Sequence, residues 1–177
     1  MTKATPIKPR DRDVILQALA AGVVPRTGLR HVQVGRAAEV GALVRDIDRL
    51  ADDPLLVGLR PMVQDLPDDD FLLDPRLVRA LNAMVRRNLV FDALVLPRHL
   101  SRLLVMADRC PELSIVVDHG AKPFIRAGRL DPWRADMAAL AARPNVACKL
   151  SGLVTEASGA WTTGDLGPYV DHLVGCF

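Results

Sequence analysis

The pattern that most constrains this fold is an alternation of short apolar runs with longer amphipathic segments. The short runs are mainly apolar throughout rather than alternating, as strands covered on both faces tend to be. The five predicted strands are Leu29–Val34, Leu56–Arg60, Val90–Leu96, Ser114–His119 and Val146–Leu150. Strands that alternate with helices form βαβ units, so the pattern predicts an α/β fold with a parallel sheet.

The segments between the predicted strands carry apolar residues at helical spacing. Asp74-Pro75 and Asp131-Pro132 each suit the start of such a helix. The predicted helical stripes are Leu77, Leu81 and Val85; Leu100, Leu103 and Ala107; Trp133, Met137 and Leu140; and segments Val40–Leu50 and Leu166–Val174, the last with Thr163 as candidate cap. From residue 56 onward the predicted strands start 34, 24 and 32 residues apart. These spacings are close to the ~30 residues of one βαβ unit.

Composition excludes several classes of protein. The chain has 177 residues, a length typical of one domain, and no apolar run approaches the ~18 residues of a membrane span. The 23 basic residues nearly balance the 21 acidic ones, and only seven residues are aromatic. We therefore expect no nucleic-acid partner and no membrane partner. The N-terminal segment lacks an apolar signal-peptide core, and three widely spaced cysteines fit reduced thiols, so we expect a cytoplasmic protein.

Polar side chains collect where the predicted strands end, which is where parallel α/β folds place their sites. They are Arg60, Gln64, Asp118, His119, Lys122, Lys149 and Ser151. His119 is a candidate for catalysis because an imidazole can polarise a carbonyl, move a proton near neutral pH or bind a metal. The alternative is a hydrogen-bonded histidine that only ends a strand. For Arg60 and Lys149, binding of a substrate carboxylate or alkoxide competes with a structural ion pair to Asp118.

Other candidate motifs are weaker. Ser151 has no G-x-S-x-G context, which argues against a serine triad. His99 and His172 lie on predicted helices, where packing or solvated roles suffice, and Cys148 lies between apolar neighbours that favour packing. The chain has no H-x-H, H-E-x-x-H or P-loop motif, so no complete metal site is encoded locally.

Four segments together carry a resemblance to a known family. They are Leu56–Asp65, Phe91–Val95 with Pro97-Arg98, Val117–His119 with Lys122-Pro123, and Cys148–Gly152 followed by Thr155-Glu156-Ala157. In this order they resemble the amidohydrolase-related family (amidohydrolase 2), in the branch of lactonases that act on L-fuconolactone, L-rhamnonolactone or pyrone dicarboxylate. The resemblance extends from about residue 46 to residue 177. It implies a (β/α)₈ barrel and hydrolysis of a lactone ring.

The resemblance also implies roles for the strand-end residues. His119 matches the sixth-strand histidine that helps polarise the lactone carbonyl, and it is the predicted catalytic residue. The predicted substrate-binding residues are Arg60, Gln64, Lys122, Lys149 and Ser151. The predicted ligand is a small-molecule lactone, either a sugar-acid lactone or a carboxylated ring. Because most members of this branch work without a tightly bound metal, the resemblance implies that this chain has no metal cofactor.

The sequence departs from the family pattern in two motifs. It has no first-strand H-x-H, and it stops at Phe177 before the eighth-strand aspartate of a Gly-Ser-Asp-Trp-Pro run. We therefore expect one domain over residues 1–177, incomplete at both ends: a partial TIM-like barrel lacking about three strands. Exposed strand edges would favour self-association. Two alternatives stay open, namely a metal-dependent amidohydrolase or decarboxylase with zinc near His119, and a non-catalytic remnant that acts as an interaction module.

Overall fold

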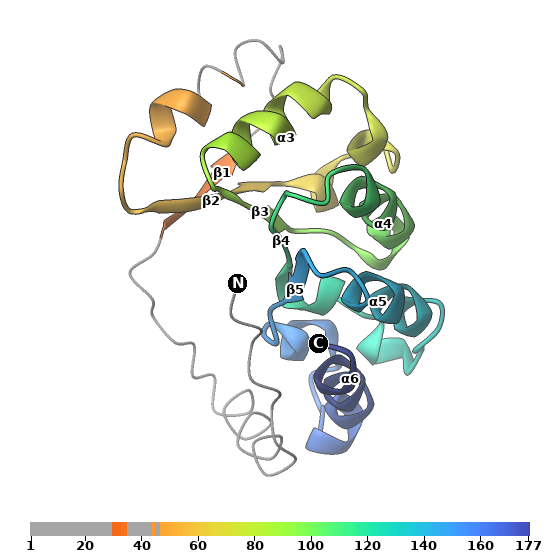
Figure 1. Cartoon of the computed structure of the whole chain (residues 1–177). Coiled ribbons are helices and arrows are strands. Elements are labelled where there is room, and N and C mark those ends of the chain that lie inside the picture. The colour runs from red at the N-terminus through yellow and green to blue at the C-terminus, as the bar shows by residue number, and fades with distance from the viewer. Residues whose placement is uncertain (1–29, 35–43, 45–46) are drawn as a thin grey trace.

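The computed structural model describes residues 30–34, 44 and 47–177. The strands in this part of the chain form one sheet, in which each strand pairs in parallel with the next along the sequence (Figure 1). They are β1 (Arg30–Val34), β2 (Leu56–Pro61), β3 (Val90–Ala93), β4 (Ile115–Val117) and β5 (Val146–Cys148). The predicted α/β fold is confirmed, and this strand order is that of consecutive strands in a (β/α)₈ barrel.

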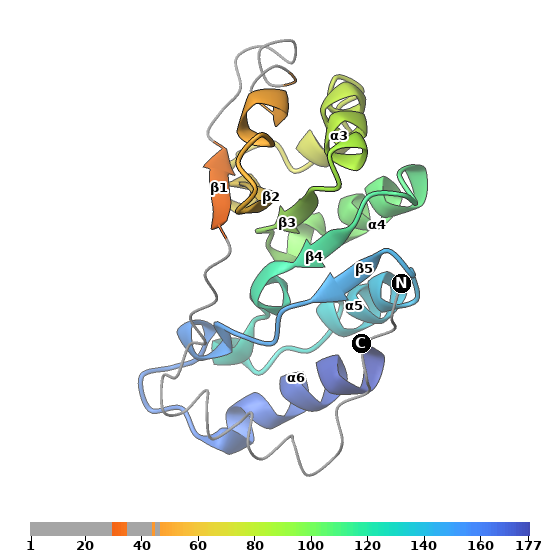
Figure 2. The same ribbon diagram turned by 60° about the vertical axis from the view of Figure 1, so that its left-hand side comes forward.

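A helix follows each strand from β2 onward, because parallel neighbours need a crossover connection. The helices are α3 (Leu77–Arg86), α4 (Leu100–Arg109), α5 (Trp133–Ala141) and α6 (Thr163–Cys176). Short 3₁₀ helices lie at Val63–Asp65, Phe71–Leu73, Pro97–His99, Asp118–Ala121, Ile125–Ala127 and Leu153–Glu156. Both views show the four α-helices on one side of the curved sheet, which leaves its other face for the site (Figures 1 and 2).

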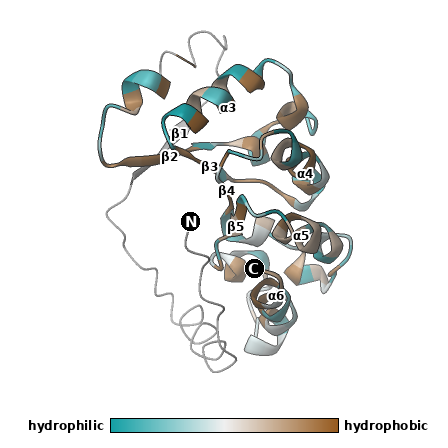
Figure 3. Ribbon diagram, viewed as in Figure 1, coloured by the Kyte–Doolittle hydropathy of each residue, from teal (hydrophilic) through white to brown (hydrophobic). Residues whose placement is uncertain are grey.

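The core lies between the sheet and these helices. Apolar residues of the strands and helices meet there, and Figure 3 shows the apolar parts of the helices turned towards the strands. The buried residues at this interface include Leu59, Phe91, Ile115, Val117, Leu81, Leu103, Met137, Leu140, Leu166 and Val170. Full burial of one such side chain stabilises the fold by about 1.5–3 kcal/mol. This layer supports the strand ends that carry the polar residues.

Three observed strands end earlier than the apolar runs predicted. The chain leaves the sheet after Ala93 and enters the 3₁₀ helix Pro97–His99, although the apolar run continues to Leu96. Strand β4 ends at Val117 because the backbone turns into the left-handed region at His119. Strand β5 ends at Cys148, and residues 149–152 form a loop. Residue 29, where the first strand was predicted to begin, lies outside the described residues.

The predicted helices are present where the structure describes them, but α3 begins at Leu77 and α5 at Trp133, just after the predicted starts at Asp74-Pro75 and Asp131-Pro132. The cap of α6 is Thr162 rather than Thr163: the carboxylate of Asp165 accepts hydrogen bonds from the Thr162 N–H and hydroxyl at 2.7 and 2.8 Å. The helix predicted over 40–50 falls mostly outside the described residues, and residues 44 and 47–50 are helical. None of the helices described here is long and apolar enough to cross a membrane.

Candidate active site at the strand ends

A left-handed turn after β4 carries two of the predicted site residues. His119, Gly120, Ala121 and Lys122 have φ angles of 51°, 57°, 58° and 52°. Only glycine adopts this region readily, and each other residue costs about 1–2 kcal/mol there. The turn is held by the buried Trp133, whose indole N–H donates a 2.7 Å hydrogen bond to the Gly120 carbonyl. Such strain persists only where packing enforces it, and it is typical of functional sites.

The imidazole of His119 lies between a hydroxyl and a carboxylate. Its Nδ1 atom is 2.9 Å from the Ser151 hydroxyl, and its Nε2 atom is 3.4 Å from Asp118 Oδ2. Gly152 leaves space for the ring, because a Cβ there would lie 2.6 Å from Nδ1. Gly152 also has a φ of +67°, which favours glycine. The loop after β5 therefore packs directly against the imidazole and orients it.

Four charged residues form a compact cluster beside this histidine, which we call the charge cluster: Arg60, Asp92, Asp118 and Lys149. The carboxylates of Asp92 and Asp118 are fully buried. Asp92 contacts Arg60 Nη2 at 2.6 Å, Arg60 Nε at 2.8 Å and Lys149 Nζ at 2.9 Å. Asp118 lies 3.1 Å from both Arg60 Nη2 and Lys149 Nζ. Buried carboxylates are stable in the charged form only with such partners.

The sheet register explains why the charge cluster forms. Leu59 pairs with Phe91, so the next residues, Arg60 and Asp92, lie side by side on the face opposite the helices. Val117 pairs with Cys148 in the same way, which brings the residues that follow them together. The ion pair to Asp118, left open as an alternative by the sequence, is therefore observed for both Arg60 and Lys149. Their role in substrate binding stays a prediction.

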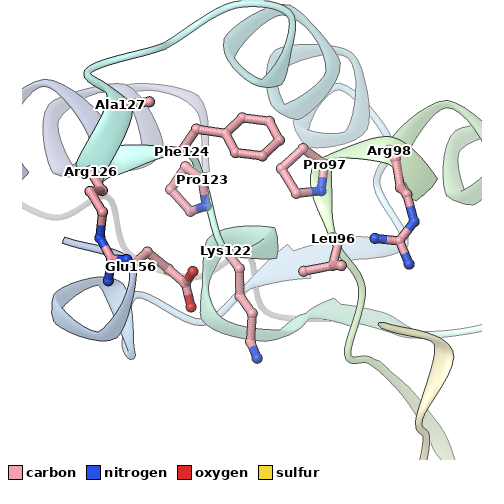
Figure 4. A pocket seen from close by; sticks show the side chains of 9 residues that line it. All are labelled: Leu96, Pro97, Arg98, Lys122, Pro123, Phe124, Arg126, Ala127 and Glu156. Atoms are coloured by element: carbon pink, nitrogen blue, oxygen red, sulfur yellow. The ribbon is translucent and has the colours of Figure 1, made fainter. Parts of the chain in front are cut away.

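Lys122 lies apart from the charge cluster and lines a hollow of about 310 Å³ (Figure 4). The lining residues are Leu96, Pro97, Arg98, Lys122, Pro123, Phe124, Arg126, Ala127 and Glu156. Figure 4 shows Arg126 and Glu156 on one wall and Arg98 on the opposite wall. Arg98 is paired with Asp69 at 2.7 Å, whereas Lys122 forms no ion pair with any of the residues described here.

The structure brings four predicted residues together, namely Arg60, His119, Lys149 and Ser151. None of these four lines the hollow, whereas Lys122 does. Gln64 is not among the residues that line the hollow; its backbone carbonyl accepts a 3.2 Å hydrogen bond from Arg98, and its side-chain oxygen is buried with no hydrogen-bond partner in the described region. Sequence reasoning missed Asp92. Two signals could have found it: it is an acidic residue inside an otherwise apolar strand, and it lies within Phe91–Val95, one of the segments that carry the family resemblance.

The other singled-out residues have packing roles. The buried His99 accepts a 3.1 Å hydrogen bond from the Leu96 N–H at Nδ1, and burial lowers its pKa. His172 Nε2 is hydrogen-bonded to the Arg134 carbonyl at 2.8 Å. Burial raises the pKa of Cys148 to about 12, which makes its thiol a poor nucleophile.

The described residues do not fit a metal centre. In the parts of the chain that the structure covers, no three His, Cys, Asp or Glu side chains converge on one point. The two carboxylates nearest His119 already contact the cations of Arg60 and Lys149, whose charge disfavours a second cation. We therefore derive no chemical step through a metal.

Comparison with known proteins agrees with this geometry. A family model described as amidohydrolase matches residues 9–177. The chain belongs to the amidohydrolase family. It is 58% identical over 112 residues to an L-fucono-1,5-lactonase of Burkholderia ambifaria, an alignment that covers 63% of this chain and 39% of that protein. It is also 35% identical over 127 residues to an L-fucono-1,5-lactonase of Burkholderia multivorans, covering 68% of this chain and 42% of the relative.

Solved structures give the same family. Two crystal structures of an amidohydrolase from Burkholderia multivorans, one with bound HEPES and one with bound zinc, match with TM-scores of 0.69 and 0.70 at 26% identity. Each match covers 96% of this chain and 69% of the other. The resemblance predicted from the strand-end motifs is confirmed. The chain spans about two fifths of the length of the lactonases it matches.

Proposed function

We propose that this chain carries part of a lactonase active site, in which His119 polarises the carbonyl of a sugar-acid lactone during ring-opening hydrolysis. The observation that carries this proposal is the placement of the imidazole. It stands on a left-handed turn, between Ser151 and the buried Asp118, and the same turn carries Lys122, which lines the hollow. The similarity to L-fucono-1,5-lactonases supports the same reaction class.

The chemistry follows from the electronic demands of an ester. Water adds to the lactone carbonyl carbon, the carbonyl oxygen becomes an oxyanion, and the ring C–O bond then breaks. The added water loses one proton and the ring oxygen gains one as it leaves as a hydroxyl group, so the product is a hydroxy acid. A donor aimed at the oxyanion is worth about 3–4 kcal/mol of barrier. His119 and the Lys122 ammonium are the groups to which we assign that stabilisation, and we assign no general base among the described residues.

The polar residues that line the hollow indicate which class of substrate it suits. Its polar lining consists of Arg98, Lys122, Arg126 and Glu156, which suits the hydroxyl groups and the developing carboxylate of an aldonic acid. A ring with an additional carboxylate is the second substrate class to test, because three of these four groups are cationic. For Gln64 and Ser151, a role in substrate binding stays a prediction.

A metal-dependent amidohydrolase is the second candidate function. The relative with bound zinc favours a metal-dependent amidohydrolase, whereas the described residues of this chain lack a ligand set. Zinc-free protein and protein supplied with zinc should therefore be assayed side by side. The further expectations are a lactone ligand, self-association and no nucleic-acid partner, which light scattering and binding assays can test.

The experiment that tests the proposal is a lactone panel scored by proton release. It includes L-fucono-1,5-lactone, other aldonolactones and a carboxylated lactone, each measured against buffer alone. We expect at least one sugar lactone to open faster with protein than without it. Rates equal to buffer across the panel, with and without added zinc, would refute lactonase activity for this chain.

A further inference from the structure

Asp92 makes the shortest contacts in the charge cluster. The resemblance described above implies no role for this residue. Its carboxylate is fully buried on β3, and it contacts Arg60 and Lys149, two of the three cations predicted to bind substrate. Arg60 approaches it through Nη2 and Nε at 2.6 and 2.8 Å, and Lys149 Nζ is 2.9 Å from both of its oxygens. These are short, charge-assisted contacts, which are the strong class of hydrogen bond.

Asp118 is held differently, although it contacts the same two cations. Its oxygens lie 3.1 Å from Arg60 Nη2 and Lys149 Nζ, and neither accepts an aligned hydrogen bond from the residues described. It is nevertheless fully buried and lies 3.4 Å from His119 Nε2. The position of this carboxylate beside the imidazole therefore depends on where the two cations stand.

We propose that Asp92 is a positioning residue of the active site: it holds Arg60 and Lys149 so that they fix the charged Asp118 against His119. This inference rests on the proposed lactonase function. Two carboxylates and two cations make the charge cluster neutral, which is the arrangement that a buried site tolerates. Arg60 and Lys149 then act on the imidazole through Asp118, and Lys122 is the cation that meets the substrate.

The first test uses the unmodified protein and does not depend on activity. The side chain of Lys149 is one-third exposed, and Lys122 is also only partly buried, so an amine-acylating reagent can reach both. An ammonium held by two carboxylates must give up those contacts to react. We expect Lys122 to be acylated several-fold faster than Lys149, as resolved by peptide mass spectrometry. Equal rates for the two lysines would overturn the proposal.

The second test is kinetic and uses Asp92→Asn, which keeps the shape of the side chain and removes its charge. We expect kcat to fall by about 10- to 100-fold with KM changed less than twofold, since misplaced catalytic groups cost rate rather than substrate affinity. Asp92→Glu, which restores the charge, should recover part of kcat. The double variant Asp92→Asn with Lys149→Met should lose no more kcat than the worse single variant, because both changes break one arrangement.

The matched control is Asp108→Asn. Asp108 is also clamped by one arginine, Arg143, at 2.8 and 3.0 Å, but this pair lies on the helix side of the sheet and is exposed. It should keep wild-type kcat. Wild-type activity in folded Asp92→Asn would overturn the positioning role and leave the lactonase function standing. An inactive wild-type protein would instead refute the lactonase function, while the acylation rates would still decide how Lys149 is held.

Discussion

Substitution of Gly152 by alanine tests directly whether the loop after β5 orients His119. A Cβ at this position would lie 2.6 Å from Nδ1 and 2.8 Å from Cγ of the imidazole, whereas ordinary contacts begin at 3.4 Å. The ring must therefore move by about 0.8 Å. A displacement of about 1 Å in a catalytic group can cost about 100-fold in rate. We expect Gly152→Ala to lower kcat by about 10- to 100-fold.

The same substitution also strains the backbone, and that effect must be separated from the clash. Alanine at a φ of +67° costs about 1–2 kcal/mol, which for a chain of this length lowers Tm by roughly 2–8 °C. Gly128 provides the control, because its φ is +61° and a Cβ there meets no atom within 4 Å. Gly128→Ala should show a similar fall in Tm with wild-type kcat. Full activity in Gly152→Ala, or an equal loss in Gly128→Ala, would refute the reasoning.

Two further predictions concern stability. Lys122 has a φ of +52°, so Lys122→Gly should relieve strain and raise the free energy of unfolding by about 1 kcal/mol in chemical denaturation, while lowering lactone hydrolysis; a stability below wild type would contradict this. Burial lowers the pKa of His99 below its ordinary value of 6.5, so the unfolded chain binds a proton that the folded chain does not. This contribution to stability is therefore present above about pH 6.5 and is lost as the pH falls towards the lowered pKa. In His99→Asn the side-chain oxygen can still accept the hydrogen bond from the Leu96 N–H, but the titrating imidazole is gone. Tm should therefore depend less on pH in this range. An unchanged pH dependence of Tm would contradict the prediction.

Much of the fold could be predicted from the sequence, because strands covered by helices need continuous apolar runs. Strand ends were harder to predict. Leu94 and Val95 are buried like strand residues, yet they lie beyond β3 in the connection to the helix Pro97–His99. Burial alone does not distinguish a strand from a packed connection. The alternation of elements was therefore more informative than any single boundary.

The candidate site was predicted in part. His119, Lys149 and Ser151 follow their strands in sequence, and a parallel sheet brings such positions together. The left-handed turn could not be predicted, because Gly120 was the only residue in it that favours a positive φ. Asp92 was noticeable as an acidic residue inside an apolar strand, but its partner could not be predicted, since its pairing with Arg60 depends on the register between β2 and β3.

The hollow is a tertiary feature with no local sequence signal. Arg98, Arg126 and Glu156 come from three separate segments that meet only in the folded chain. Arg98 and Glu156 belong to segments that carry the family resemblance, but nothing in the local sequence indicates that they and Arg126 meet around one hollow. They lie on the 3₁₀ helices Pro97–His99, Ile125–Ala127 and Leu153–Glu156, which follow three different strands.

The most direct test of the central claim compares His119→Asn with wild type on the sugar lactone that wild type opens fastest. The matched variant is His172→Asn, which removes an imidazole that is bonded to the Arg134 carbonyl, packs against Trp133 and contacts none of the charge cluster. Proton release gives kcat/KM for each folded protein. We predict a loss of at least about 100-fold for His119→Asn, in line with the removal of an oxyanion donor, and near wild-type values for His172→Asn. Equal kcat/KM for His119→Asn and wild type would contradict the account.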